Sequence, residues 1–564
     1  MPAIVLTRAA AVGMLIGLSI TAPAAAEAPT DAGMAETTEV RTSSPLLAPD
    51  RPTVAPALVE SQEAVRSFYA QRLDAPVWHD GDRWSPAASA ALALLKTAER
   101  HGLRPSDYLP AEGDALVQAP PTDRADVALT RGVLHYLRDV TGGRIPATQR
   151  PGHRYPHGVP NPPKAAAALL SQALEAPDTG AALADMMPAD PQYPRLMNAL
   201  ADLRLLRDAT GGWPHVPKGP SLREGDIDHR VPLLRASLVM HGDLAPTDAV
   251  VGETLYDATL VAAVSRFQQR HGISVDGVLG PDTLRTLNVP VGQRIEQIVA
   301  NLERLRWDPA PPLVGKFIEV NVANYGLTAY ENGAPALTMR VVVGTKKHKT
   351  PLFTDYMDDV VLNPTWTVPR SIAANEILPK MRADPGYVFG QDMQVHASWK
   401  WKAPVLDPFE VDWWNVEGRS MPYRFVQRAG PGNALGLVRF SLNNDFAIYM
   451  HDTPSKSLFS RPHRSYSHGC MRVENYDRLL RFVAGSAYDG MRRRLDKGDT
   501  VSIPLPEPVD VRVSYRTVWR EDDGSLHVRR DVYDNDAEVL QRLQEEGRKL
   551  IALKPQERQK NQAE

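Results

Sequence analysis

The sequence contains a single cysteine, Cys470, in 564 residues. This count excludes an intramolecular disulfide framework, a CxxC redox pair and a cysteine-rich zinc module. Charge of one sign is also lacking, because 64 Lys and Arg residues stand against 67 Asp and Glu residues, for a net charge of −3. The balance therefore favours neither a nucleic-acid partner nor a polybasic, membrane-surface protein.

Long apolar runs are absent except near the N-terminus. Residues 9–22 are apolar and are followed by Ala24-Ala25-Ala26, so residues 1–26 predict a secretory signal peptide. An uncleaved membrane anchor is the alternative, but the run is shorter than the ~20 residues of a spanning helix. Residues 27–56 are rich in Pro, Thr, Ser and Ala, which predicts a disordered linker. A lone thiol in an exported protein is either deeply buried or kept for its reactivity.

Residues 57–225 have the pattern of a helical scaffold domain. Ser85-Pro86 is a helix start, and Gly102 ends the following run. A second helix is predicted over 127–140, with Gly142-Gly143 as its stop. No cluster of acids, histidines or glycines in this region indicates chemistry.

Residues 226–290 predict a small helical module. Asp257 is the expected cap of a helix, Asp276-Gly277 a tight turn, and Pro281 the start of the next helix. Together with Phe267-Gln268-Gln269 and Thr283-Leu284, these residues resemble the three-helix peptidoglycan-binding module of cell-wall enzymes. A spacer that has lost wall binding is the alternative, since the same residues build the fold.

From about residue 316 the hydrophobic period changes from 3.6 to 2. The alternation over 317–322, the hairpin signal Asn332-Gly333 and the runs 336–343 and 447–450 predict strands. A helix capped by Asn475 is expected within this mostly β domain, which we place at 315–505. Residues 506–564 predict a hairpin over 511–529, a charged helix and a tail. The predicted fold class is therefore multidomain α+β.

The segment 451–472 carries the residues suited to covalent chemistry. A thiol is a weak nucleophile until a base removes its proton. His451, at an expected strand end, and His468, two residues before Cys470, are both candidate bases. Spacing alone does not choose between them. Zinc ligation by these three residues and His463 is the alternative, but their spacing matches no standard short pattern.

The run Ser467-His468-Gly469-Cys470-Met471-Arg472, with His451 nineteen residues before the cysteine, resembles the active site of the YkuD-type L,D-transpeptidases. Residues 363–372, 432–436 and 449–454 resemble the large periplasmic branch of that family. The branch has a helical scaffold, a peptidoglycan-binding module and a catalytic domain with a capping insertion, here expected over 363–435. Within this insertion lie five tryptophans, expected either to close over the substrate or to form its core: Trp366, Trp399, Trp401, Trp413 and Trp414.

The resemblance implies a role for each matching residue. Cys470 is expected to be the nucleophile and His451 the general base, with an orienting backbone carbonyl near Asp452. The backbone N–H of Gly469 is expected to stabilise the oxyanion. The residues expected to contact substrate are Ser467, His468, Arg472, Tyr449 and Asn433. No cofactor and no metal are implied.

The function implied is peptidoglycan cross-linking in the periplasm through a Cys470 thioester, with inhibition by carbapenems. Stem peptides are the expected substrates, and other wall-synthesis proteins are the protein partners that the resemblance implies. Two alternatives stay open: an L,D-carboxypeptidase that trims tetrapeptide stems, and a non-catalytic wall-binding scaffold. A papain-like peptidase fits less well, because in that class the cysteine precedes the histidine, whereas here His451 comes first.

Overall fold

A computed structural model describes residues 60–560, apart from residues 74, 111, 160–164, 249–251, 309–311 and 313. The predicted signal peptide and linker lie outside the described residues. None of the described helices is long and apolar enough to cross a membrane.

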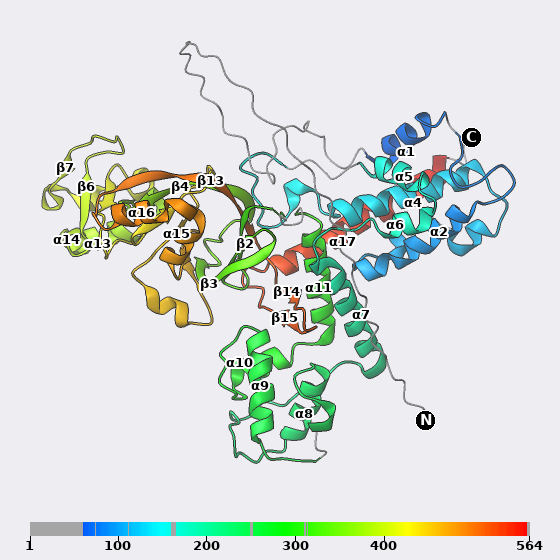
Figure 1. Ribbon diagram of the computed structural model, residues 1–564, viewed down its shortest axis with the longest axis horizontal. Coiled ribbons are helices and arrows are strands. Elements are labelled where there is room, and N and C mark those ends of the chain that lie inside the picture. The colour runs from blue at the N-terminus through cyan, green and yellow to red at the C-terminus, as the bar shows by residue number, and fades with distance from the viewer. Residues whose placement is uncertain are drawn as a thin grey trace, which may run out of the picture. The chain divides into compact units, whose positions relative to one another are not determined.

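The N-terminal region is helical, as its sequence predicts (Figure 1). Its main helices are α1 (Glu60–Ala70), α2 (Pro86–Lys96), α4 (Asp123–Gly142), α5 (Ala166–Leu174) and α6 (Thr179–Ala184). Ser85 caps α2 by accepting a hydrogen bond from the Ala88 amide. Gly143 ends α4 with a φ of +84°, and a Cβ there would collide with the Trp307 ring. Gly143 is therefore needed both for the helix end that the sequence predicts and for close packing against Trp307.

Two further helices, α7 (Gln192–Thr210) and α11 (Val291–Leu305), pack against each other and share a core. Val518 and Val528, from the C-terminal hairpin β14 (Val518–Arg520) and β15 (Leu526–Val528), complete this core. Helix α17 (Asn535–Lys560) also packs on α11. The C-terminal segment thus helps to build the middle of the chain.

The predicted module contains α8 (Val231–Met240), α9 (Ala258–Arg270) and α10 (Pro281–Leu287). The Asp257 side chain caps α9, as expected. The Gln268 side-chain carbonyl accepts the amides of Asp276 and Gly277 and so holds the tight turn. Val216 and Leu222 pack into the same core, although the sequence boundary at 226 assigns them to the scaffold.

The catalytic candidate region is built on a nine-stranded sheet, ordered β11-β3-β12-β10-β9-β4-β13-β1-β2. Strand β2 also pairs with β3, which closes the sheet on itself. The strands are β1 (Lys316–Asn321), β2 (Gly326–Glu331), β3 (Ala334–Gly344), β4 (Phe353–Leu362), β9 (Val438–Phe440), β10 (Met450–His451), β11 (Ser465–Ser467), β12 (Met471–Val473) and β13 (Val501–Ser514). Helices α15 (Tyr476–Ala484) and α16 (Tyr488–Leu495) pack on its core, and Asn475 caps α15 as predicted.

Two strands differ from their predicted extents. β13 crosses the boundary placed at 505, because Val509, Val511 and Val513 all pack into the sheet core between β4 and β1. The predicted hairpin over 511–529 is therefore shorter and starts at β14. β10 begins only at Met450, since Ala447 has a φ of +55° that interrupts an extended strand.

The expected insertion forms a separate four-stranded sheet, ordered β5-β8-β6-β7. Its elements are β5 (Trp366–Thr367), α12 (Arg370–Ile372), α13 (Leu378–Ala383), α14 (Tyr387–Gly390), β6 (Met393–His396), β7 (Val405–Leu406) and β8 (Arg424–Gln427). Trp413 is buried in its core, whereas Trp401 and Trp414 are 83% and 74% exposed. The tryptophans thus divide between core and surface.

Candidate active site

The cysteine and the strand-end histidine lie on one face of the sheet. β10 pairs in parallel with β12, so that Met450 is opposite Met471 and His451 is opposite Arg472. Both methionines pack into the hydrophobic core. Because successive strand residues alternate between faces, His451 and Arg472 point to the other face. Cys470 and Tyr449 occupy the preceding register position, where the Met471 amide still bonds to the Tyr449 carbonyl.

His451 is buried, with 5% of its surface exposed, and its ring is held in one orientation. Its Nδ1 lies 2.6 Å from the backbone carbonyl oxygen of Asp452. A carbonyl can only accept a hydrogen bond, so Nδ1 carries the proton and Nε2 keeps its lone pair. Burial, together with the nearby Arg472 guanidinium, lowers the pKa of His451 to about 3. The imidazole is therefore neutral and able to accept a proton through Nε2.

The Cys470 thiol is protonated in the resting state. Burial raises the pKa of Cys470 above its ordinary value, while hydrogen bonds from the Tyr449 backbone and side chain lower it. Arg472 and Arg439 lower the Cys470 pKa further. The Sγ atom lies 3.6 Å from the carbonyl oxygen of Ala447, to which the thiol donates. The site thus combines a neutral thiol with a neutral base.

A tight loop precedes the cysteine. The Ser467 hydroxyl donates to the Cys470 carbonyl at 2.6 Å and accepts the Gly469 N–H at 3.1 Å. Gly469 has a φ of +121°, which favours glycine at this position. Its N–H is therefore occupied inside the loop, which argues against the predicted use of this group as an oxyanion donor. No acceptor within the described residues is assigned to the N–H of Cys470.

The same loop is supported from outside by residues that sequence patterns did not single out. The Thr350 hydroxyl donates to the Gly469 carbonyl at 2.7 Å and accepts the Gly344 amide at 2.9 Å. The Tyr533 hydroxyl donates to the Gly344 carbonyl and accepts the Thr350 amide. Tyr533 lies 183 residues from Thr350 in the chain, so no local signal identifies this support.

The His468 side chain is engaged with residues outside its own loop. Its Nε2 lies 2.6 Å from Glu376 Oε1, in the insertion, and its ring stacks on His348 at 4.5 Å. The loop between His468 and Cys470 is not extended, because Gly469 adopts a positive φ. The two side chains therefore do not share a face in the way that an extended segment would produce.

The other residues expected at substrate are distributed unevenly. Tyr449 packs edge-on against His451, and Arg439 lies 5.5 Å above the Tyr449 ring. Arg472 has a buried Nε without a partner among the described residues. Asn433, in contrast, uses its amide inside its own loop, where it accepts the Leu435 N–H and donates to backbone carbonyls. Asn433 therefore shapes a loop, and the structure gives it no free polar atom for substrate.

Two of the histidines considered for zinc ligation, His451 and His468, have other partners. Within the described part of the chain, no three His, Cys, Asp or Glu side chains are grouped to hold a metal ion. His451 uses Nδ1 for the Asp452 carbonyl, and His468 pairs with Glu376. The arrangement suits proton transfer from a thiol to an imidazole.

Three known families match successive parts of the chain. Residues 63–200 match "Scaffold domain", residues 238–287 match "Putative peptidoglycan binding domain", and residues 315–503 match YkuD, "L,D-transpeptidase catalytic domain". A curated protein of Haemophilus influenzae, named "Putative L,D-transpeptidase", is 34% identical over 247 residues. The alignment covers 43% of this chain and 49% of that protein, so the chain spans about half the length of this relative.

Solved structures of L,D-transpeptidases also match, with low overall similarity. One from Stackebrandtia nassauensis is 13% identical, covers 54% of this chain and 98% of its own, and has a TM-score of 0.20. One from Xylanimonas cellulosilytica is 15% identical, covers 53% of this chain and 99% of its own, and has a TM-score of 0.17. The family matches thus identify along this chain a scaffold domain, a putative peptidoglycan-binding domain and a catalytic domain of the YkuD L,D-transpeptidase type.

Proposed function

We propose that this protein is a periplasmic L,D-transpeptidase that cross-links peptidoglycan stem peptides through a thioester on Cys470. One observation carries the proposal: His451, with Nδ1 fixed by the Asp452 carbonyl, lies on the same face of paired strands as Cys470. An imidazole with a free Nε2 beside a thiol is the arrangement that activates a cysteine nucleophile.

The first half-reaction transfers the donor peptide to the enzyme. The thiol proton moves to His451 Nε2 as the sulfur attacks the carbonyl carbon between the third and fourth stem residues. The carbonyl oxygen becomes an oxyanion, and the N–H of Cys470 is the donor available for it. The C–N bond then breaks, the leaving D-alanine amine takes the proton from His451, and a thioester remains.

The second half-reaction depends on which nucleophile reaches the thioester. An amine from a neighbouring stem loses a proton to His451, attacks the thioester carbon and releases the Cys470 thiolate, which is then reprotonated. A cross-link is the product. Water in place of the amine yields a tripeptide and makes the enzyme an L,D-carboxypeptidase.

The charge state of Cys470 and His451 determines when the proton passes between them. The lowered pKa of His451 and the raised pKa of Cys470 favour a neutral pair before substrate binds. We therefore expect the thiol proton to pass to His451 as the sulfur attacks the carbonyl carbon. The negative charge that develops on sulfur is then removed as the C–S bond forms. The Tyr449 hydrogen bonds and Arg472 stabilise sulfur charge during that step.

The test is incubation of the mature protein with disaccharide-tetrapeptide, followed by mass spectrometry. A dimer lacking one D-alanine is expected, and Cys470→Ala and His451→Ala should each abolish it. His527→Ala is the matched control, because this histidine stacks on Trp519 in the C-terminal hairpin and lies outside the catalytic-domain match. Fragmentation of the dimer identifies the acceptor amine.

Other outcomes separate the alternatives. Tripeptide without dimer indicates carboxypeptidase activity. No turnover, combined with no carbapenem adduct on Cys470, contradicts the enzymatic proposal and leaves a wall-binding scaffold. Full activity of His451→Ala would remove this histidine as the base.

A further inference from the structure

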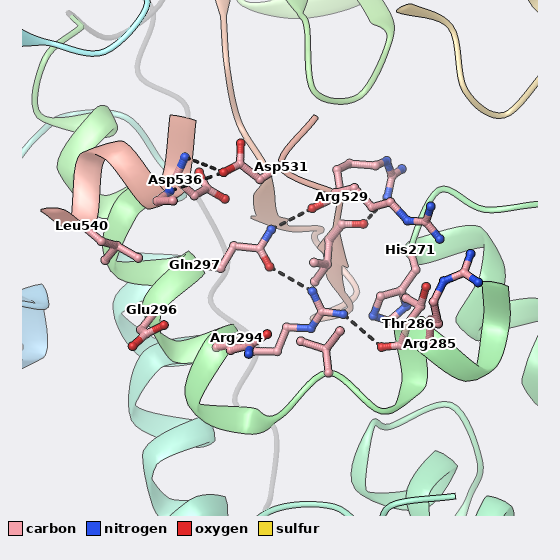
Figure 2. A pocket seen from close by; sticks show the side chains of 15 residues that line it. His271, Arg285, Thr286, Arg294, Glu296, Gln297, Arg529, Asp531, Asp536 and Leu540 are labelled. Atoms are coloured by element: carbon pink, nitrogen blue, oxygen red, sulfur yellow. Dashed lines mark hydrogen bonds between the residues drawn. The ribbon is translucent and has the colours of Figure 1, made fainter. Parts of the chain in front are cut away.

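A cavity of about 420 Å³ lies away from the cysteine, where the end of the predicted module meets the C-terminal segment (Figure 2). Its walls come from α10, α11, β15 and the start of α17. This volume is in the range of sites for small organic ligands. The cavity is lined by four arginines, Arg285, Arg294, Arg529 and Arg530.

Arg294 is a buried cation whose hydrogen-bond partners are neutral. The residue is only 9% exposed, and its guanidinium donates to the side-chain carbonyl of Gln297 at 3.0 Å and to the backbone carbonyl of Thr286 at 3.2 Å. Within the described residues, no carboxylate lies in ion-pair distance of Arg294. Burial and the nearby Arg270 lower the pKa of Arg294 to about 10. A buried charge without a counter-ion is costly to keep.

Arg529 also donates to neutral groups, and its guanidinium lies 4.7 Å from the centroid of the Trp519 ring. Its guanidinium donates to Asn324 Oδ1 at 2.7 Å and to two backbone carbonyls, those of Arg270 and Val528. No ion pair to a described carboxylate is formed by Arg529 either. Figure 2 shows Gln297 between the two arginines, bonded to the Arg294 guanidinium and to the Arg529 backbone carbonyl. Burial and Arg464 lower the pKa of Arg529 and the nearby Glu521 raises it, so Arg294 is the less compensated of the two cations.

The acidic groups on the cavity walls are already engaged or point away. Asp536 pairs with Arg304 at 2.5 Å. Asp531 accepts the amides of Asn535 and Asp536 at the start of α17. Glu296 is exposed, and Figure 2 shows it directed away from the arginines. These carboxylates therefore form no ion pair with Arg294 or Arg529.

The rim adds more positive charge than negative. Arg285 and Arg530 both pair with one carboxylate, that of Asp282. His271 lines the cavity with Nδ1 bonded to the Phe267 carbonyl, and burial lowers its pKa well below the ordinary value. Its Nε2 is therefore a neutral acceptor. The cavity offers guanidinium donors for an anion and one acceptor for a hydroxyl or amide of the same ligand.

We propose that this cavity is a binding site for a small organic anion, whose carboxylate or phosphate group is held between Arg294 and Arg529. Guanidinium groups bind both oxyanions through charge-assisted hydrogen bonds. Such a ligand supplies the counter-charge that the protein itself lacks at this position. The cavity is larger than a single ion requires, so an organic ligand with further polar groups fits it better than a free ion.

The anionic group of the ligand is either a peptide carboxylate or a phosphate ester, and two probes distinguish these. The carboxylates of a peptidoglycan stem peptide are one source, and this choice rests on the proposed function. A phosphate ester is the other source and does not depend on it. The probes are disaccharide-tetrapeptide and inorganic pyrophosphate, titrated calorimetrically into the full mature protein carrying Cys470→Ala, so that catalysis does not interfere.

Hydrogen exchange locates the binding. We expect the probe to slow amide exchange in residues 285–297 and 529–540, whereas occupancy of the transpeptidase site alone slows exchange around residues 447–472. Protection by the muropeptide indicates a carboxylate ligand, and protection by pyrophosphate indicates a phosphate ligand. A failed transpeptidation assay leaves this result unaffected, because the two measurements report on different segments.

Variants of the cavity walls decide the assignment. Arg294→Gln and Arg529→Gln should each weaken calorimetric binding at least tenfold, with melting temperatures showing that the proteins are folded. Arg529 is less buried than Arg294, so its substitution keeps the test available if Arg294→Gln does not fold. Glu296→Gln, the matched control, should leave the affinity unchanged within about twofold or tighten it. Absence of protection by both probes, or equal affinity of all three variants, overturns the proposal.

Discussion

Replacing Thr350 by valine removes one oxygen atom that supports the loop before Cys470. The residue is 1% exposed, and its hydroxyl donates to the Gly469 carbonyl and accepts the Gly344 amide. Valine has nearly the same shape but leaves both backbone groups without this partner. Each unsatisfied buried group costs about 1–3 kcal/mol, so the free energy of unfolding should fall by about 2–6 kcal/mol.

The stability loss is measurable by calorimetry. A loss of about 3 kcal/mol lowers the melting temperature of a domain of this size by roughly 6–12 °C. We also expect a lower kcat, because the Gly469–Cys470 peptide sets the direction of the Cys470 N–H. A displacement of about 1 Å at such a position costs on the order of 100-fold in rate.

Two controls separate the hydrogen bonds from other effects of the substitution. Thr350→Ser keeps the oxygen and should cost about 1 kcal/mol, for the lost methyl group. Thr338→Val makes the same chemical change on an exposed position of β3 and should change stability by less than about 0.5 kcal/mol. If Thr350→Val melts and turns over like Thr350→Ser, the hydrogen bonds do not support the loop and the reasoning is refuted.

Two further predictions concern protonation. Tyr449→Phe removes a hydrogen bond that lowers the Cys470 pKa, so alkylation of Cys470 by iodoacetamide should require higher pH; an unchanged pH profile would contradict this role. The pKa of His451 is lowered to about 3 from 6.5, so its neutral form contributes stability fully above pH 6.5, and this contribution is lost as pH falls. Between pH 6.5 and 5 the loss is about 2 kcal/mol, and in His451→Gln the change in unfolding free energy over this interval should be smaller by that amount. Chemical denaturation at several pH values measures it, and an unaltered slope would exclude the effect.

The helices could be predicted because the residues that cap them lie next to them in the sequence. Ser85, Asp257 and Asn475 each accept a backbone amide at the start of the helix they were expected to cap. The insertion was also expected near its observed position, from residues that resemble a known branch of the family. The ends of the strands depend on their pairing partners, which local sequence does not specify. β13 continues to Ser514 since β1 and β4 flank it on both sides.

The sequence by itself determined the candidate nucleophile, the two candidate bases and the resemblance to a cell-wall enzyme family, since these depend on residue identity and spacing. Only the tertiary structure decided which histidine shares a face with Cys470, because that depends on parallel pairing between β10 and β12. The structure also showed that the Gly469 N–H donates to the Ser467 hydroxyl. No local sequence pattern predicts the proposed anion cavity, because Arg294 and Arg529 are 235 positions apart in the chain. Long-range packing brings such groups together, and burial then fixes their charges.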